Sequence, residues 1–220
     1  MDGRLQPGKV VDVIDHLAQY WAPKVSGRQH PRHRIKSRVT VAWGLDGALD
    51  ALDPVGSRPA ENRAMESWIV ENVSAGGVGA LVPSIPGEWL QVGCLVAMLP
   101  EGGRNWILGT VKRLRRNDES GAQVGIQTLA RSPTPVAFRI QLDNATAFRA
   151  ETGILLDPGI SEAEVPVVMR ARTSQRGRTF VLERDGRRTQ LVPIAVMARG
   201  PDYEVARCRQ LVRSKREAPR

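Results

Sequence analysis

From Val39 to Leu129 the chain alternates short apolar runs with polar, turn-rich segments. Runs of this length and composition are typical of β-strands. Glu101–Arg104 and Asn117–Gly121 are turn clusters between neighbouring apolar runs, which predicts hairpins. The pattern therefore predicts a small antiparallel barrel, because closure leaves no exposed sheet edge. Its six expected strands are Val39–Trp43, Trp68–Asn72, Val78–Val82, Leu95–Leu99, Asn105–Leu114 and Gln123–Leu129.

The segment Gly44–Ser67 interrupts this pattern with Gly, Pro, Asp and Ala, and we expect a long loop with one short helical turn there. Arg131–Pro135 is a second interruption and predicts a domain boundary, so the barrel spans residues 32–130. Beyond it, β-patterning resumes, and Asp185–Gly186 is a two-residue hairpin signal. We expect a second small β domain over residues 131–206, with strands at Gly153–Leu156, Val165–Arg172, Arg178–Arg184 and Arg187–Arg199. No internal sequence repeat is evident.

The two ends of the chain differ from this β-rich centre. Residues 8–21 predict an amphipathic helix, because Val10, Ile14, Leu17 and Trp21 recur at helical spacing. A polar, proline-flanked linker follows, so residues 1–31 are expected to be a helix and linker. Residues 207–220 predict a basic tail that forms a short helix and then frays.

The charge and the composition of the chain limit the functions that it could have. The 220 residues carry a net charge of +9, and 27 of the 32 basic residues are arginine, which favours anionic partners such as nucleic acid, anionic lipid or nucleotides. No apolar run approaches the length needed to span a bilayer, and no signal peptide is visible, so a cytoplasmic protein is expected. Cys94, Cys208 and the three histidines match no metal-ligand spacing, which indicates buried structural thiols and no metal site.

The candidate site is a two-part motif. Arg34-x-x-x-Arg38 runs into the first expected strand, and Asn72-x-Ser74-x-x-Gly77 joins the second strand to the third. A guanidinium group can form paired hydrogen bonds to a phosphate or to the O6/N7 edge of guanine, and can also stack on a base. An amide and a hydroxyl add contacts, and a glycine permits close backbone approach. These groups suit an anionic ligand that carries guanine bases. We expect Arg34, Arg38, Asn72, Ser74 and Gly77 to bind such a ligand, supported by Arg32, His33 and Gly76.

At these residues the chain resembles the PilZ family of bacterial cyclic di-GMP receptors, over about residues 32–130. The resemblance includes both motifs, the apolar run Val78–Val82, and the strand pair Ile107–Arg113 and Val124–Leu129. It implies a six-stranded antiparallel barrel that wraps cyclic di-GMP with its N-terminal loop. Two features depart from the usual pattern: residue 72 is Asn rather than the commoner Asp, and Gly44–Ser67 looks like an insertion that covers or reshapes the pocket.

The sequence predicts a mainly β, non-enzymatic receptor whose ligand is cyclic di-GMP, with no other cofactor. Nucleotide capture between residues 28–38 and the Asn72–Gly77 corner would change how the helix or the second domain meets a protein partner. A homodimer is compatible with this reading. Two alternatives stay open: a ligand-free, PilZ-like interaction module, and an arginine-rich barrel that binds nucleic acid. Each of these features also has a purely structural interpretation. Arg34–Arg38 could be a solvated basic segment, Asn72–Ser74 could serve only to form a turn, and Trp68, Trp89 and Trp106 could pack in the core.

Overall fold

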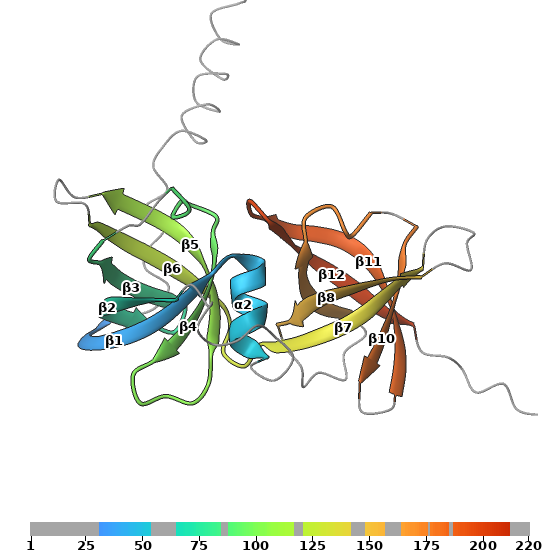
Figure 1. Cartoon of the computed structure of the whole chain (residues 1–220), viewed down its shortest axis with the longest axis horizontal. Helices are drawn as coiled ribbons and strands as arrows, with labels where there is room; N and C mark the ends of the chain where they lie inside the picture. Colours follow the sequence, from blue (N-terminus) through green and yellow to red (C-terminus); the bar gives the residue numbers. More distant parts are fainter. Residues whose placement is uncertain are drawn as a thin grey trace, which may run out of the picture. The chain divides into compact units, whose positions relative to one another are not determined.

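The computed structural model describes residues 31–53, 65–84, 88–116, 121–141, 148–156, 164–175, 177–184 and 187–211. These residues form one helix and twelve strands, all antiparallel to their neighbours (Figure 1). The expected helix at residues 8–21 and the linker that follows it lie outside the described residues, as do residues 212–220. Among the described residues, no helix is both long enough and apolar enough to cross a membrane.

The first barrel confirms the predicted fold. Its six strands close in the order β1-β2-β3-β6-β5-β4. Alternate side chains of these strands point inward and form a core that includes Val41, Trp68, Val96 and Ile126. The strands are β1 (His33–Trp43), β2 (Met65–Ser74), β3 (Gly77–Val82), β4 (Leu95–Pro100), β5 (Ile107–Arg116) and β6 (Ala122–Ala130).

The second β domain is also a closed six-stranded barrel, with the order β10-β11-β12-β9-β8-β7. Read from β7, this is the connectivity of the first barrel, a structural repeat that the sequence did not reveal. Phe138, Met169, Phe180 and Cys208 belong to its core. The strands are β7 (Thr134–Gln141), β8 (Phe148–Leu155), β9 (Glu164–Arg170), β10 (Thr179–Arg184), β11 (Arg187–Arg199) and β12 (Tyr203–Leu211).

Several expected elements have different bounds in the structure. β7 and β12 were not predicted, and β12 continues five residues beyond the expected end of the domain at residue 206. The expected hairpin around residues 185–186 is confirmed, because β10 pairs with β11 from Phe180–Leu191 to Arg184–Arg187. The short helical turn expected after β1 is instead a nine-residue helix, α2 (Gly44–Leu52).

Helix α2 packs on the outer face of the first barrel and not in its interior. Leu45, Ala48 and Ala51 are buried against outward-facing residues of β1 and β4. The N-cap residue Trp43 supplies no side-chain hydrogen bond to the helix. Asp202, in the turn between β11 and β12, accepts a hydrogen bond of 2.6 Å from the Leu45 backbone N–H. A carboxylate at this position satisfies a free N–H group and complements the helix dipole.

The two barrels share a third apolar cluster. It joins Leu95 and Leu108 of the first barrel to Ile154, Val168 and Tyr203 of the second. Within it, the Tyr203 and Thr110 hydroxyl oxygens are 2.9 Å apart and hydrogen-bonded, and both residues are almost fully buried. Burial is the main cause that raises the pKa of Tyr203, which keeps its hydroxyl protonated. The second barrel therefore has its own core and also shares buried apolar contacts with the first.

Candidate functional site

The turn between β2 and β3 is held by hydrogen bonds from β6 and the residue that follows it. The Gly76 carbonyl accepts one from the Thr128 N–H at 3.1 Å, and the Ala75 carbonyl accepts one from the Arg131 guanidinium at 3.2 Å. The Ser74 hydroxyl donates to the Gly77 carbonyl at 3.3 Å. Ser74 thus has a role in the turn itself, while its oxygen keeps acceptor capacity for a ligand.

Beside this turn, two glycines on neighbouring strands leave a shallow depression in the outer face of the sheet, because neither has a side chain. Gly79 of β3 is paired with Gly125 of β6. A Cβ on Gly79 would lie 2.6 Å from the Asn72 amide nitrogen, and a Cβ on Gly125 would lie 3.3 Å from the Arg113 Cβ, so these two side chains lie close over the glycines. Residues paired across antiparallel strands share a face of the sheet. A single row therefore crosses five strands in the order Arg34, Asn72, Gly79, Gly125, Arg113.

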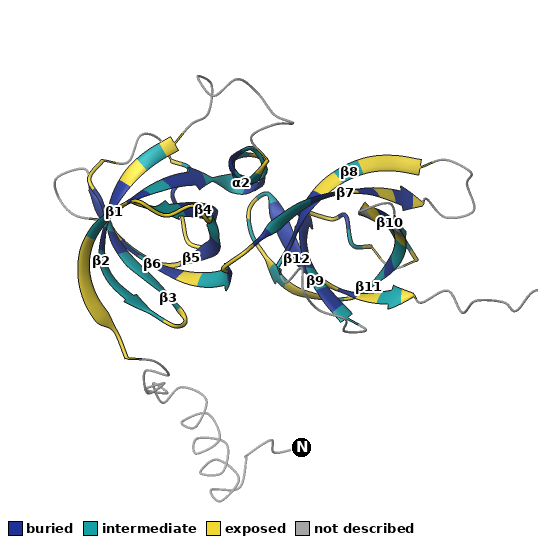
Figure 2. Cartoon of the chain, turned by 90° about the horizontal axis from the view of Figure 1, so that it is seen from below, coloured by how far each residue is buried: buried dark blue, intermediate teal, exposed yellow. Residues whose placement is uncertain are grey.

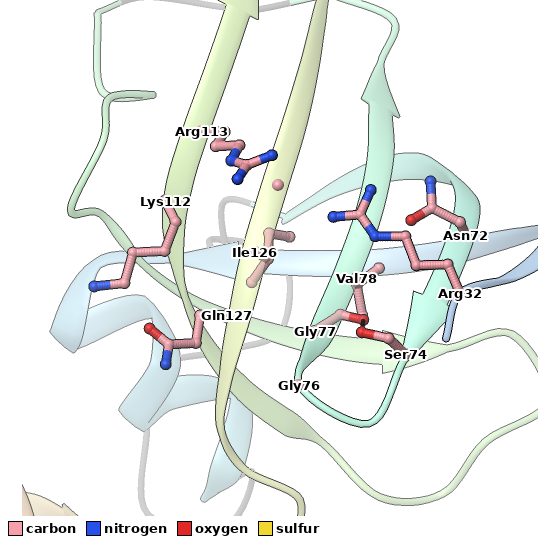
Figure 3. A pocket seen from close by; sticks show the side chains of 11 residues that line it. Arg32, Asn72, Ser74, Gly76, Gly77, Val78, Lys112, Arg113, Ile126 and Gln127 are labelled. Atoms are coloured by element: carbon pink, nitrogen blue, oxygen red, sulfur yellow. Dashed lines mark hydrogen bonds between the residues drawn. The ribbon is translucent and has the colours of Figure 1, made fainter. Parts of the chain in front are cut away.

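A pocket of about 180 Å³ opens over this row and the turn, and we call it the glycine groove. Its lining has three cationic side chains and no acidic one. Figure 3 shows the guanidinium groups of Arg32 and Arg113 pointing toward each other from opposite sides of the groove. The lining residues are Arg32, Asn72, Ser74, Gly76, Gly77, Val78, Lys112, Arg113, Gly125, Ile126 and Gln127.

The structure brings together most, but not all, of the expected site residues. Arg32, Asn72, Ser74, Gly76 and Gly77 line the glycine groove. The other three expected residues belong to β1 and do not line it.

Among these three, Arg34 lies closest, because it is paired with Asn72 and faces the same side of the sheet. Arg38 is paired with Ile69, three residues further along β2, or about 10 Å at the usual strand rise. Its backbone forms hydrogen bonds with Glu101. His33 is paired with Val73, whose side chain packs against the barrel core, so alternation directs His33 away from the groove face.

Besides the apolar Val78 and Ile126, four lining residues were not predicted from the sequence: Lys112, Arg113, Gly125 and Gln127. They belong to the strand pair β5 and β6, which the family resemblance includes but to which it assigns no ligand contact. Placing them at the site requires the register of β6 against β3, a pairing of residues about 50 positions apart. A local sequence pattern does not contain that register.

The tryptophans pack in the first barrel, as expected, and do not line the groove. Trp68 is fully buried in the core. Trp89 stacks on Trp43 with ring centroids 4.3 Å apart and on Trp68 at 6.1 Å. Trp106 packs against the cluster shared by the two barrels. Both cysteines are free and buried, and the Cys94 thiol donates a hydrogen bond to the Trp89 carbonyl.

Neither a protein-family model nor a curated protein matches the chain. Among solved structures, a similar one is described as MrkH, a novel c-di-GMP dependence transcription regulatory factor; it is 10% identical, with a TM-score of 0.27, over 80% of this chain and 78% of that one. Another is the K. pneumonia MrkH–c-di-GMP complex, 9% identical, with a TM-score of 0.27, over 95% of this chain and 87% of that one. Likenesses at this TM-score support no conclusion about this chain.

Proposed function

We propose that this chain is a non-enzymatic receptor for cyclic di-GMP, which it binds in the glycine groove of the first barrel. The observation that carries the proposal is the row in which Asn72 and Arg113 flank Gly79 and Gly125, with Arg34 at the far end. The paired glycines let the Asn72 amide and the Arg113 side chain lie close to the sheet, where both can contact a flat purine. The flanking guanidinium groups match both the phosphates and the guanine edges of the ligand.

The size of the groove limits how much of the ligand it can hold. A volume of about 180 Å³ is below the roughly 300–1,000 Å³ of a typical small-molecule pocket. The groove therefore holds part of the dinucleotide, and the start of β1 supplies further contacts from Arg34 and Arg38. Both are exposed in the structure, so their side chains can turn toward a ligand without leaving a core.

Signalling to a protein partner is the second half of the proposal. β5 carries Arg113 at the groove and, three residues earlier, Thr110 at the contact with Tyr203 of the second barrel. Ligand contacts at Arg113 are therefore connected by a single strand to the shared core. In this proposal, nucleotide binding alters the surface that the second barrel presents to a partner.

Calorimetric titration with cyclic di-GMP tests the proposal, with Arg113→Ala as the site variant and Arg115→Ala as its control. Arg115 is exposed on the same strand and does not line the groove. Losing a charge-assisted hydrogen bond costs about 1.5–3 kcal/mol, so Arg113→Ala should weaken binding by about 10- to 100-fold. The control variant should bind like the wild type. Absence of binding to the wild type would refute the proposal, and equal loss in both variants would refute the site.

A salt series separates this function from the nucleic-acid alternative. An oligonucleotide held by many phosphate contacts loses affinity steeply with salt, because each contact releases counterions. The affinity for cyclic di-GMP bound in a pocket should fall less steeply with salt. GMP and cyclic di-AMP should bind more weakly than cyclic di-GMP. Tighter binding of the oligonucleotide, with a steep salt slope and no preference among dinucleotides, would support the alternative.

A further inference from the structure

The turn between β2 and β3 has Ala75 and Gly76 as its two central residues. Ser74 and Gly77 pair on either side of them, so the turn closes a two-residue hairpin. Neither Ala75 nor Gly76 has a positive φ angle. The two-residue turns whose twist matches that of the flanking strands need at least one positive φ angle. The position of this turn therefore depends on contacts with the rest of the barrel.

Two hydrogen bonds to carbonyl groups of the turn supply such contacts. The Thr128 N–H of β6 donates to the Gly76 carbonyl at 3.1 Å. The guanidinium group of Arg131, just beyond the end of β6, donates to the Ala75 carbonyl at 3.2 Å. A charged donor makes the stronger kind of hydrogen bond, although exposure of the Arg131 side chain to water reduces its contribution. Arg131 thus holds the side of the turn that Thr128 does not reach.

The backbone at Arg131 is itself anchored by buried residues on both sides. Ala130, the last residue of β6, is 6% exposed and belongs to the apolar cluster shared by the two barrels. Pro133 is buried two residues after Arg131, and β7 of the second barrel begins at Thr134. Figure 2 shows this short connection between β6 and β7. The group that holds the turn is therefore attached where the chain passes from one barrel to the other.

A ladder row also leads from this turn to the contact between the barrels. Gly77 is paired with Gln127, and Gln127 is paired with Thr110. The Thr110 hydroxyl is hydrogen-bonded to the Tyr203 hydroxyl of the second barrel. Cross-strand pairs share a face of the sheet, so Gly77 and Thr110 are separated by two strand spacings, or about 10 Å. The glycine groove therefore lies next to the part of the first barrel that the second barrel contacts.

We propose that Arg131 is a positioning residue of the nucleotide site, which fixes the turn that carries Ser74 and Gly77 and ties it to the connection between the barrels. This inference rests on the proposed function, because it assigns a means of regulation to the glycine groove. A change in the contact between the barrels would move Arg131, release the Ala75 carbonyl and lower the affinity for cyclic di-GMP. Reciprocally, ligand binding would favour the arrangement of the barrels in which this hydrogen bond forms.

Amide hydrogen exchange tests the structural half of the inference without a ligand. Arg131→Ala should speed the exchange of the Thr128 N–H by about 2- to 10-fold, because loss of one hydrogen bond lets the turn open more often. Arg131→Lys keeps a charged donor and should restore most of the protection. Arg115→Ala removes the same charge from β5 and should leave the rate unchanged. The Gly93 N–H, which is bonded to the Val111 carbonyl, should exchange alike in all variants and so excludes a general loss of stability.

Calorimetric titration with cyclic di-GMP tests the regulatory half. Arg131→Ala should weaken binding by about 2- to 10-fold, and Arg131→Lys should bind close to the wild type. Pro133→Gly loosens the connection between the barrels and should weaken binding as well. The double variant should bind like Arg131→Ala alone, because both substitutions act through the same hydrogen bond.

These measurements separate the inference from the function on which it rests. Failure of the wild type to bind cyclic di-GMP would refute the proposed function, and the exchange rate of the Thr128 N–H would still decide whether Arg131 holds the turn. Wild-type binding with no loss in Arg131→Ala, or an unchanged Thr128 exchange rate in that variant, would overturn the inference. Additive effects of Arg131→Ala and Pro133→Gly on affinity would also overturn it, because the two residues would then act independently.

Discussion

The buried hydrogen bond between Thr110 and Tyr203 gives the most decisive test of the contact between the barrels. Both residues are at most 3% exposed, so removing one hydroxyl leaves the other without a partner in an apolar surrounding. That loss costs about 1–3 kcal/mol, whereas removing both hydroxyls with little change of shape is nearly neutral. Tyr203→Phe and Thr110→Val should therefore each destabilise the protein by about 1–3 kcal/mol, and the double variant by less than their sum.

Urea unfolding monitored by tryptophan fluorescence measures these differences, provided that the slope of the transition stays constant. For a chain of this size, each kcal/mol lowers the melting temperature by about 2–4 °C, so calorimetry gives a second measurement. Thr40→Val is the control, because Thr40 is half-buried on β1 and its side chain makes no hydrogen bond within the described part of the chain. Strictly additive effects of the two substitutions would contradict the contact.

Three further predictions concern stability. Gly77→Ala should destabilise the first barrel by about 1–3 kcal/mol or more in urea unfolding, because its Cβ would fall on the backbone carbonyl of Ile126 across the ladder; an unchanged midpoint would refute that packing. Gly47→Ala should instead stabilise the protein by about 0.5–1 kcal/mol, since its Cβ would be 3.9 Å from the nearest atoms and alanine favours a helix. Burial raises the pKa of the Cys208 thiol from 9.0 to about 12, so the thiol stays protonated in the fold and ionises earlier in the unfolded chain. The free energy of unfolding should therefore fall as the pH rises from about 9 toward 12, and Cys208→Ala should reduce that slope in urea titrations at several pH values.

Strands could be predicted from the sequence where apolar and polar residues alternate without interruption. They were not predicted where nearby residues suggested another kind of structure. β7 alternates Val136, Phe138 and Ile140, yet prolines 133 and 135 at its start suggested only a boundary. β12 alternates Ala206 and Cys208 with Arg207 and Arg209, which looked like the start of a basic tail. α2 contains two glycines in nine residues, so its stability depends on packing that local propensity does not include.

The candidate site divides in the same way. The Asn72–Gly77 corner could be predicted because its polar groups and glycine are contiguous in the chain. The opposite side of the groove, with Arg113 and Gly125, follows from strand order and register, which depend on contacts distant in sequence. Arg38 shows the limit of spacing as a guide, because a bulge in β1 and the strand direction place it further from the groove than Arg34, and its contact with a ligand stays a prediction.

The hydrogen bond from Leu45 to Asp202 has a practical consequence for anyone who wishes to divide this protein. A truncation after the first barrel would remove the only side-chain acceptor found at the start of α2 in the described part of the chain, and would expose Leu95 and Leu108 to water. We expect such a fragment to aggregate on expression. Shortened versions of the protein for crystallisation or labelling should therefore keep residues 32–211 intact.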